Sequence, residues 1–279
     1  MPLVATADLI DDAGRHGRAV GAFNAICLEH AEAIAAGAEL VGLAAIIQIS
    51  ENAVGFHGGR LAPLADACAA VARASAAPLA LHLDHVESDA LLREAAGYSF
   101  SSVMYDASTR PYAENVVATR AAVEWGHAHG LWVESELGEV GGKDGAHAPG
   151  VRTSPVEAAL YVEATGVDGL AVAVGSSHAM LDRTAVLDHD LIARLRDAVG
   201  IPLVLHGSSG ASDAELRAAV RAGMVKVNVG TALNVAFTAA VRAHLDDDPK
   251  VADPRRYLTP ARDAMAVVVA SFLRVLAGH

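Results

Sequence analysis

Short apolar runs alternate with stretches of helical spacing along the whole chain. The apolar runs are near-continuous, which is typical of parallel strands whose outer face is covered by helices. Eight such runs predict strands at residues 20–25, 44–50, 79–85, 101–106, 131–138, 169–175, 202–207 and 224–230. The stretches between them predict helices at residues 30–40, 61–76, 88–96, 112–129, 155–165, 190–199, 213–222 and 232–245.

Eight strand–helix units in series predict an α/β fold: a single TIM (β/α)8 barrel over residues 1–279, with an additional C-terminal helix at residues 261–276. The length of 279 residues suits one barrel or two smaller domains, and the repeated units favour the barrel. An open doubly wound sheet is the alternative. No GxGxxG motif follows the first predicted strand, which disfavours a dinucleotide site.

Composition narrows the classes of partner. Hydrophobic residues make up 53% and charged residues 19%, so the chain can bury a large core. The formal charge of −12 argues against nucleic acid and against an anionic membrane, although a few local cations can still hold a phosphorylated substrate. The N-terminus lacks the pattern of a signal peptide, and we expect a cytoplasmic protein in which Cys27 and Cys68 are free thiols.

The longest glycine-rich stretch lies at residues 138–153, directly after the fifth predicted strand. It carries both signs of charge and has no periodicity. Active sites of barrels form on the face to which this loop belongs. We therefore expect a mobile lid over the site.

Polar groups collect at the C-terminal ends of the predicted strands, where they are costly unless they are paired or functional. These positions are Asn24, Ser50, Asp84, His85, Asp106, Glu134, Glu136, His178, His206 and Asn228. Three of them are histidines, and three imidazoles with one open position make a catalytic zinc site. The alternative is three unrelated core or capping histidines.

The carboxylates are expected to divide by role. Asp84 precedes a candidate ligand, so it would lie over the metal-bound substrate as a general acid or base. Glu134 and Glu136 point to the same face of a strand. Beside Asp106 they would form a second cation site or orient the histidine ligands. His82 is expected deeper in the barrel.

Two loops are candidate anion sites. Residues 206–210 (HGSSG) follow the seventh strand, and residues 228–231 (NVGT) lead from the eighth strand into a helix. Barrels commonly bind phosphate at these two loops through backbone N–H groups and the helix dipole. The sequence also permits a monovalent cation among the loop carbonyls.

Several motifs together resemble the class II, zinc-dependent ketose-bisphosphate aldolases, which include fructose-1,6-bisphosphate and tagatose-1,6-bisphosphate aldolases. They are LHLDH (81–85), VESELG (133–138), the His178 segment, VLHGSSG (204–210), VKVNVGT (225–231) and DPRRYLTPARDAM (253–265). The resemblance implies a lyase of carbohydrate metabolism, such as glycolysis, that forms a homodimer or homotetramer. Its expected substrate is fructose-1,6-bisphosphate, cleaved to dihydroxyacetone phosphate and an aldehyde.

The resemblance also implies roles for single residues. Asp84 is the proton donor to the aldehyde oxygen, and Asp106 and Glu136 match positions that can hold a second metal. The zinc ligands are His85, His178 and His206. Dihydroxyacetone phosphate contacts Gly207, Ser208, Ser209, Asn228, Val229, Gly230 and Thr231, and the pocket also includes Asn24 and Ser50.

The lid and the segment after the second zinc histidine depart from the family pattern and leave the substrate open. Asp144 stands where the lid usually carries Glu, and Ala179 stands where Gly usually contacts the phosphate. Thr259 replaces the distal-phosphate Arg of some members, and Arg262 follows three residues later, as in others. Tagatose-1,6-bisphosphate, or another phosphorylated ketose or sugar acid, is the alternative substrate.

Three other functions remain as alternatives. A Schiff-base aldolase needs a lysine in the barrel, and only Lys226 qualifies, although its other role is to partner a phosphate or carboxylate. A zinc hydrolase would commonly carry His-x-His at the end of the first strand, which ends here in FNA. A non-catalytic partner subunit of an aldolase is disfavoured because Asp84 and the three histidines are all present.

Overall fold

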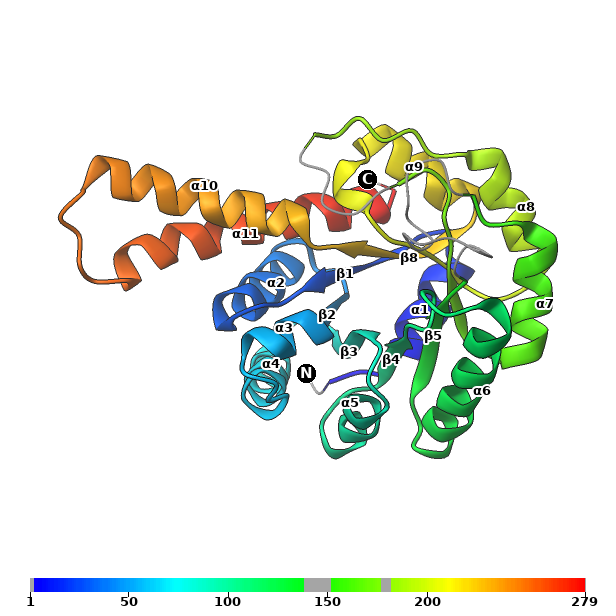
Figure 1. The fold of residues 1–279 in the computed structure, drawn as a ribbon. Helices are drawn as coiled ribbons and strands as arrows, with labels where there is room; N and C mark the ends of the chain where they lie inside the picture. Colours follow the sequence, from blue (N-terminus) through cyan, green and yellow to red (C-terminus); the bar gives the residue numbers. More distant parts are fainter. Residues whose placement is uncertain (1–2, 138–151, 177–181, 279) are drawn as a thin grey trace.

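The computed structural model describes residues 3–137, 152–176 and 182–278, and within them eight parallel strands close into a barrel in sequence order (Figure 1). The predicted α/β barrel is confirmed. The strands are β1 (Val20–Asn24), β2 (Ala45–Ser50), β3 (Leu79–Val86), β4 (Ser102–Tyr105), β5 (Trp132–Glu136), β6 (Gly169–Ala171), β7 (Leu203–Leu205) and β8 (Met224–Val229).

Helices surround the sheet. They are α2 (Leu28–Val41), α4 (Ala62–Ala74), α5 (Asp89–Glu94), α6 (Tyr112–Ala128), α7 (Pro155–Thr165), α8 (His189–Val199), α9 (Asp213–Ala222), α10 (Thr231–Asp247) and α11 (Arg255–Leu276). Helices α10 and α11 run side by side and extend beyond the barrel (Figure 1). The expected C-terminal helix is present, but it begins at Arg255 and continues through Pro260.

The two faces of the strands have different environments. In β2, and in β3 as far as Asp84, the odd-numbered residues pack in the large cluster between the sheet and the helices, as Ile47, Ile49, Leu81 and Leu83 do. Even-numbered residues point into the barrel, because successive side chains of a strand alternate. The outer face therefore carries most of the hydrophobic core.

Two short helices were not predicted. Helix α1 (Thr6–Arg15) packs against the N-terminal end of the barrel, where Ile10 joins Val20, Ala22, Ile46 and Ala80 in a small inner apolar cluster. Helix α3 (Glu51–Phe56) begins directly after β2, and the hydroxyl of Ser50 accepts a hydrogen bond from the N–H of Ala53. Ser50 thus caps a helix as well as facing the barrel mouth.

Cys27 and Cys68 are free thiols, as expected. Across the described residues, every helix is too short or too polar to cross a membrane.

Candidate active site

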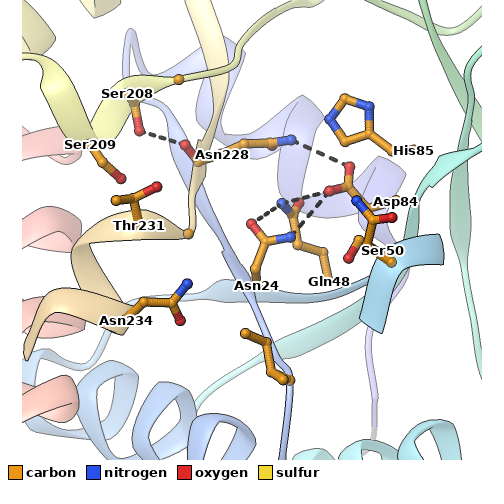
Figure 2. Close-up of a pocket in the computed structure, with 14 residues that line it drawn as sticks. Asn24, Gln48, Ser50, Asp84, His85, Ser208, Ser209, Asn228, Thr231 and Asn234 are labelled. Carbon is orange, nitrogen blue, oxygen red and sulfur yellow. Dashed lines mark hydrogen bonds between the residues drawn. The ribbon is translucent and has the colours of Figure 1, made fainter. Parts of the chain in front are cut away.

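A cavity of about 310 Å³ opens at the C-terminal ends of the strands (Figure 2). Its wall is polar, and it contains two ionisable side chains, Asp84 and His85. The other lining residues are Asn24, Ile26, Gln48, Ser50, Asn52, Gly207, Ser208, Ser209, Asn228, Gly230, Thr231 and Asn234. Ten of the seventeen predicted site residues that the structure describes therefore line one pocket.

A backbone irregularity in β3 places two consecutive residues in the same mouth. The pairing of β3 with β4 shifts register between Leu83 and Val86, and His85 has a φ of 49°. In a regular strand, His85 would point to the helices, opposite to Asp84. The left-handed φ is strained for a residue with a Cβ, and such strain is typical of functional sites. It turns the imidazole towards the cavity beside Asp84.

Three amides surround the Asp84 carboxylate (Figure 2). The Asn24 and Gln48 amide nitrogens each donate to Oδ2 at 3.2 Å, and the Asn228 amide nitrogen donates to Oδ1 at 3.5 Å. Gln48 also donates to Oδ1 of Asn24 at 2.9 Å. The carboxylate is thereby fixed from three strands.

Neighbouring side chains keep the carboxyl group of Asp84 ionised. Burial would raise the pKa of its carboxyl group, but His85, His82 and Lys226 lower that pKa well below its usual value. An ionised carboxylate at the pocket wall can accept a proton from a bound hydroxyl group.

His85 is oriented by a second carboxylate. Its Nδ1 lies 2.8 Å from Oδ2 of Asp106, which in turn accepts from the Ser108 backbone N–H and hydroxyl. Burial would lower the pKa of His85, but Asp84, Asp106 and Glu136 raise it to about 10. Nε2, the nitrogen that does not face Asp106, is the one that can bind a metal, and such binding would displace a proton from this imidazole.

His206 is held in the same way from the neighbouring side of the barrel. Its Nε2 lies 3.0 Å from Oε1 of Glu134, and its Nδ1 lies 3.5 Å from Oε2 of Glu136. The His206 and His85 rings meet edge to face with centroids 4.9 Å apart. Burial lowers the pKa of His206, so the imidazole is neutral, the form that ligates metals.

The donor atoms fit a divalent cation. Asp84, His85 and His206 offer ligand atoms within 4.8 Å of one another, and His85, Asp106 and Glu136 form a second such group. Imidazole nitrogens and carboxylate oxygens are the ligands that zinc takes in catalytic sites. A histidine ligand usually donates its other N–H to a carboxylate, and both His85 and His206 lie against one.

The two predicted anion loops meet at the other side of the cavity. Gly207 has a φ of 65° and begins the 3₁₀ turn η2 (Ser208–Gly210). The Ser208 hydroxyl donates to the backbone carbonyl of Asn228, and the Ser209 hydroxyl accepts from the N–H of Ala232 in the first turn of α10. The loops after β7 and β8 therefore form one wall.

Some predicted residues lie elsewhere. Arg262 is on α11, where it binds Glu32 at 3.0 Å outside the pocket, and the Val229 side chain packs in the outer core. Asp106, Glu134 and Glu136 lie beneath the pocket wall and touch the two histidines. His178, Ala179, Asp144 and nearly all of the predicted lid fall outside the described residues.

Four lining residues were not predicted. They are Ile26, Gln48, Asn52 and Asn234. Gln48 lies within β2 at an even-numbered position, two residues before Ser50. Its polar side chain in the otherwise apolar run Ala45–Ile49 was the available signal.

A closed barrel with buried carboxylate and imidazole groups at its mouth is the arrangement of a barrel enzyme. Residues 4–279 match the family described as fructose-bisphosphate aldolase class-II, and the chain belongs to this family. It is a class II ketose-bisphosphate aldolase, a metal-dependent lyase that acts on sugar phosphates. This result disfavours the Schiff-base, hydrolase and non-catalytic alternatives.

Individual relatives agree with this assignment. The chain is 39% identical over 277 residues to a fructose-bisphosphate aldolase of Geobacillus stearothermophilus, covering 98% of this chain and 96% of that protein. The crystal structure of the YdjI aldolase of Escherichia coli K12 is 30% identical, with a TM-score of 0.84, and covers 98% and 97% of the two chains. The fructose-bisphosphate aldolase of Campylobacter jejuni shares the fold at 24% identity, with a TM-score of 0.80 and coverage of 99% and 95%.

Proposed function

We propose that the protein is a zinc-dependent aldolase that reversibly cleaves fructose-1,6-bisphosphate to dihydroxyacetone phosphate and an aldehyde. The observation that carries this proposal is the convergence of ligand atoms of Asp84, His85 and His206 within 4.8 Å of one another. Asp84 and His85 of this group line the cavity. The name of the relative at 39% identity supports fructose-1,6-bisphosphate over tagatose-1,6-bisphosphate. As in the family, we expect a cytoplasmic homodimer or homotetramer.

His85 and His206 would hold the zinc ion together with His178. When bound, the ion supplies a Lewis acid for the ketose carbonyl and hydroxyl groups. In the cleavage direction, Asp84 accepts the proton of the C4 hydroxyl while the C3–C4 bond breaks and its electron pair passes to C3. In condensation the same carboxyl group returns this proton to the aldehyde oxygen. Asp144 of the lid would move the proton at the nucleophilic carbon.

The fixed amides around Asp84 give this proton transfer a defined geometry. Asn24 and Gln48 bind Oδ2, so Oδ1 is the oxygen nearer to Asn228 and to the two anion loops. A substrate phosphate would lie against Gly207, Ser208, Ser209, Gly230 and Thr231, at the first turn of α10. Backbone N–H groups at a helix N-terminus bind phosphate without a cationic side chain, which reconciles the site with the net charge of −12.

Metal removal and a substrate panel test the proposal. Treatment with EDTA should abolish cleavage, and zinc should restore it. A panel of fructose, tagatose and other ketose phosphates, coupled to dihydroxyacetone phosphate release, should give the highest kcat/KM for fructose-1,6-bisphosphate. Full activity of the metal-free protein would refute the zinc mechanism. A higher kcat/KM for another ketose phosphate would replace the substrate and leave the reaction class in place.

A further inference from the structure

Lys226 is an unusual residue for the interior of a barrel. It lies on β8, is fully buried, and is among the largest buried side chains of the described chain. It sits beneath the cavity rather than among its lining residues. A buried ammonium group is strongly destabilising unless it is paired and hydrogen-bonded, so its position demands a reason.

The ammonium group of Lys226 makes two short hydrogen bonds to groups of the site. Nζ lies 2.7 Å from Oε2 of Glu134 and 2.8 Å from Oδ1 of Asn228. Each of these two partners also contacts a residue of the site through its second polar atom. Oε1 of Glu134 lies 3.0 Å from Nε2 of His206. Nδ2 of Asn228 lies 3.5 Å from Oδ1 of Asp84. Lys226 therefore lies between a metal-binding histidine and the acid–base carboxylate.

The first branch, the contacts from Lys226 through Glu134 to His206, determines the tautomer of His206. A carboxylate accepts hydrogen bonds and does not donate them, so Nε2 of His206 carries the proton that faces Glu134. Nδ1 then bears the lone pair, because its distance to Oε2 of Glu136 is 3.5 Å, longer than the 3.0 Å hydrogen bond at Nε2. Lys226 neutralises Glu134 and holds its other oxygen, which fixes the carboxylate in the plane where it can accept from His206.

The second branch, the contacts from Lys226 through Asn228 to Asp84, determines the orientation of the Asn228 amide. An ammonium group only donates, so the Asn228 atom that faces Lys226 is its oxygen. The NH2 end of the amide consequently points to Asp84 and to the cavity. With a neutral apolar side chain at position 226, the amide could rotate by half a turn and present its oxygen to the Asp84 carboxylate, which would be repulsive.

We propose that Lys226 is a positioning residue that sets both halves of the site, the metal-binding nitrogen of His206 through Glu134 and the amide donor to Asp84 through Asn228. This inference rests on the proposed function, since it concerns the metal that His206 would bind. It differs from a Schiff-base role, because Lys226 contacts no substrate and acts only through its two partners.

Zinc affinity tests the first branch without any activity measurement. Chelator competition should show that Lys226→Met and Glu134→Gln each weaken zinc binding roughly 10- to 100-fold. Lys226→Met should also shift the visible absorption bands of bound Co²⁺, because the ligand geometry changes. The double variant should bind zinc no more weakly than Lys226→Met, since both substitutions interrupt one chain of contacts. The control is Met104→Leu, a buried residue paired with Glu134 in the β4–β5 register, which should leave both readouts at the wild-type value.

Turnover at saturating zinc tests the second branch. Glu134→Gln interrupts only the contact with His206, so saturating zinc should restore a larger share of its kcat than of the kcat of Lys226→Met. Lys226→Met should keep a reduced kcat because the Asn228 amide is no longer held. Thermal unfolding shows which variants are folded. If Lys226→Met does not fold, zinc affinity is measured on Glu134→Gln, and turnover is measured on Lys226→Gln.

The outcomes separate this inference from the proposed function. Wild-type zinc affinity and Co²⁺ absorption in Lys226→Met would overturn the His206 branch. Recovery of wild-type kcat by Lys226→Met at saturating zinc would overturn the Asn228 branch. Cleavage by the wild-type protein after metal removal would overturn the proposed function itself. This measurement uses the wild-type protein, so its outcome is independent of the results for the Lys226 and Glu134 variants.

Discussion

A single methyl group added at Gly230 should disturb the Asp84 carboxylate indirectly, by displacing the Asn24 side chain that binds it. A Cβ added at Gly230 would lie 2.9 Å from Oδ1 of Asn24, closer than real Cβ contacts. Asn24 cannot simply yield, because Gln48 holds that oxygen at 2.9 Å and Asp84 accepts from its amide nitrogen at 3.2 Å. We expect Gly230→Ala to displace the Asn24 side chain and to break its hydrogen bond to Asp84.

The magnitude follows from the bond that is lost. A hydrogen bond to a charged group contributes about 1.5–3 kcal/mol, which corresponds to a roughly 10- to 150-fold decrease in kcat/KM if the bond is needed in the transition state. The backbone of Gly230 has a φ of −126°, outside the left-handed region that favours glycine. The free energy of unfolding should fall by a similar amount, which thermal unfolding measures separately from the rate.

Steady-state kinetics on fructose-1,6-bisphosphate measures the effect, with two further variants as controls. Gly55→Ala adds a methyl group with no atom within 4 Å and should leave kcat/KM unchanged. Asn24→Ala removes the clashing side chain, so Gly230→Ala should add almost nothing in that background.

Two results would refute this reasoning. Wild-type kcat/KM in Gly230→Ala would show that the Asn24–Asp84 bond does not matter for the reaction. Independent, multiplying effects of Gly230→Ala and Asn24→Ala would show instead that the methyl group obstructs the substrate directly.

Three further predictions concern other parts of the structure. Gln48→Met removes the donor to Asp84 and Asn24 and should lower kcat about tenfold in steady-state assays; an unchanged kcat would contradict this role. Tyr161→Phe removes a buried hydroxyl bonded to Asn115, Thr119 and Ser135, so urea unfolding should show a loss of about 1–3 kcal/mol, whereas a neutral result would mean that these groups re-pair. Burial raises the pKa of Cys27 to about 11 and that of Cys68 to about 12. At pH 8, below both pKa values, the sulfurs stay protonated, so iodoacetamide should modify them quickly only in urea; rapid alkylation of native Cys68 would contradict its burial.

Strand order and barrel closure were predictable because they depend on a pattern repeated eight times. The continuous apolar runs reflect a sheet that is buried on both faces. An error in the bounds of one strand–helix unit does not change the number of units, and this number defines the barrel. Single elements were less predictable. Helix α1 was missed because it covers the end of the barrel and does not belong to the strand–helix repeat. Helix α11 begins at Arg255 and contains Pro260, whereas the sequence pattern predicted that this helix begins at residue 261, directly after the proline.

The candidate site shows the same division. Asp84 and His206 follow from the alternation of a strand, but regular alternation would direct His85 to the outer face. The register shift and the φ of 49° that turn it inwards depend on contacts between β3 and β4, which local sequence does not encode. Asn234 was missed because it lies one helical turn into α10 and reaches the cavity only through the tertiary fold.

The separation of the two strand faces has a consequence for how such a protein can evolve. In β2, and in β3 as far as Asp84, the odd-numbered side chains pack against the helices, whereas Gln48, Ser50, His82 and Asp84 occupy the even-numbered positions. Substitutions at even-numbered positions can therefore change the substrate or the reaction while the helical coat stays intact. A one-residue deletion in either strand would exchange the two sets and destroy folding and activity together.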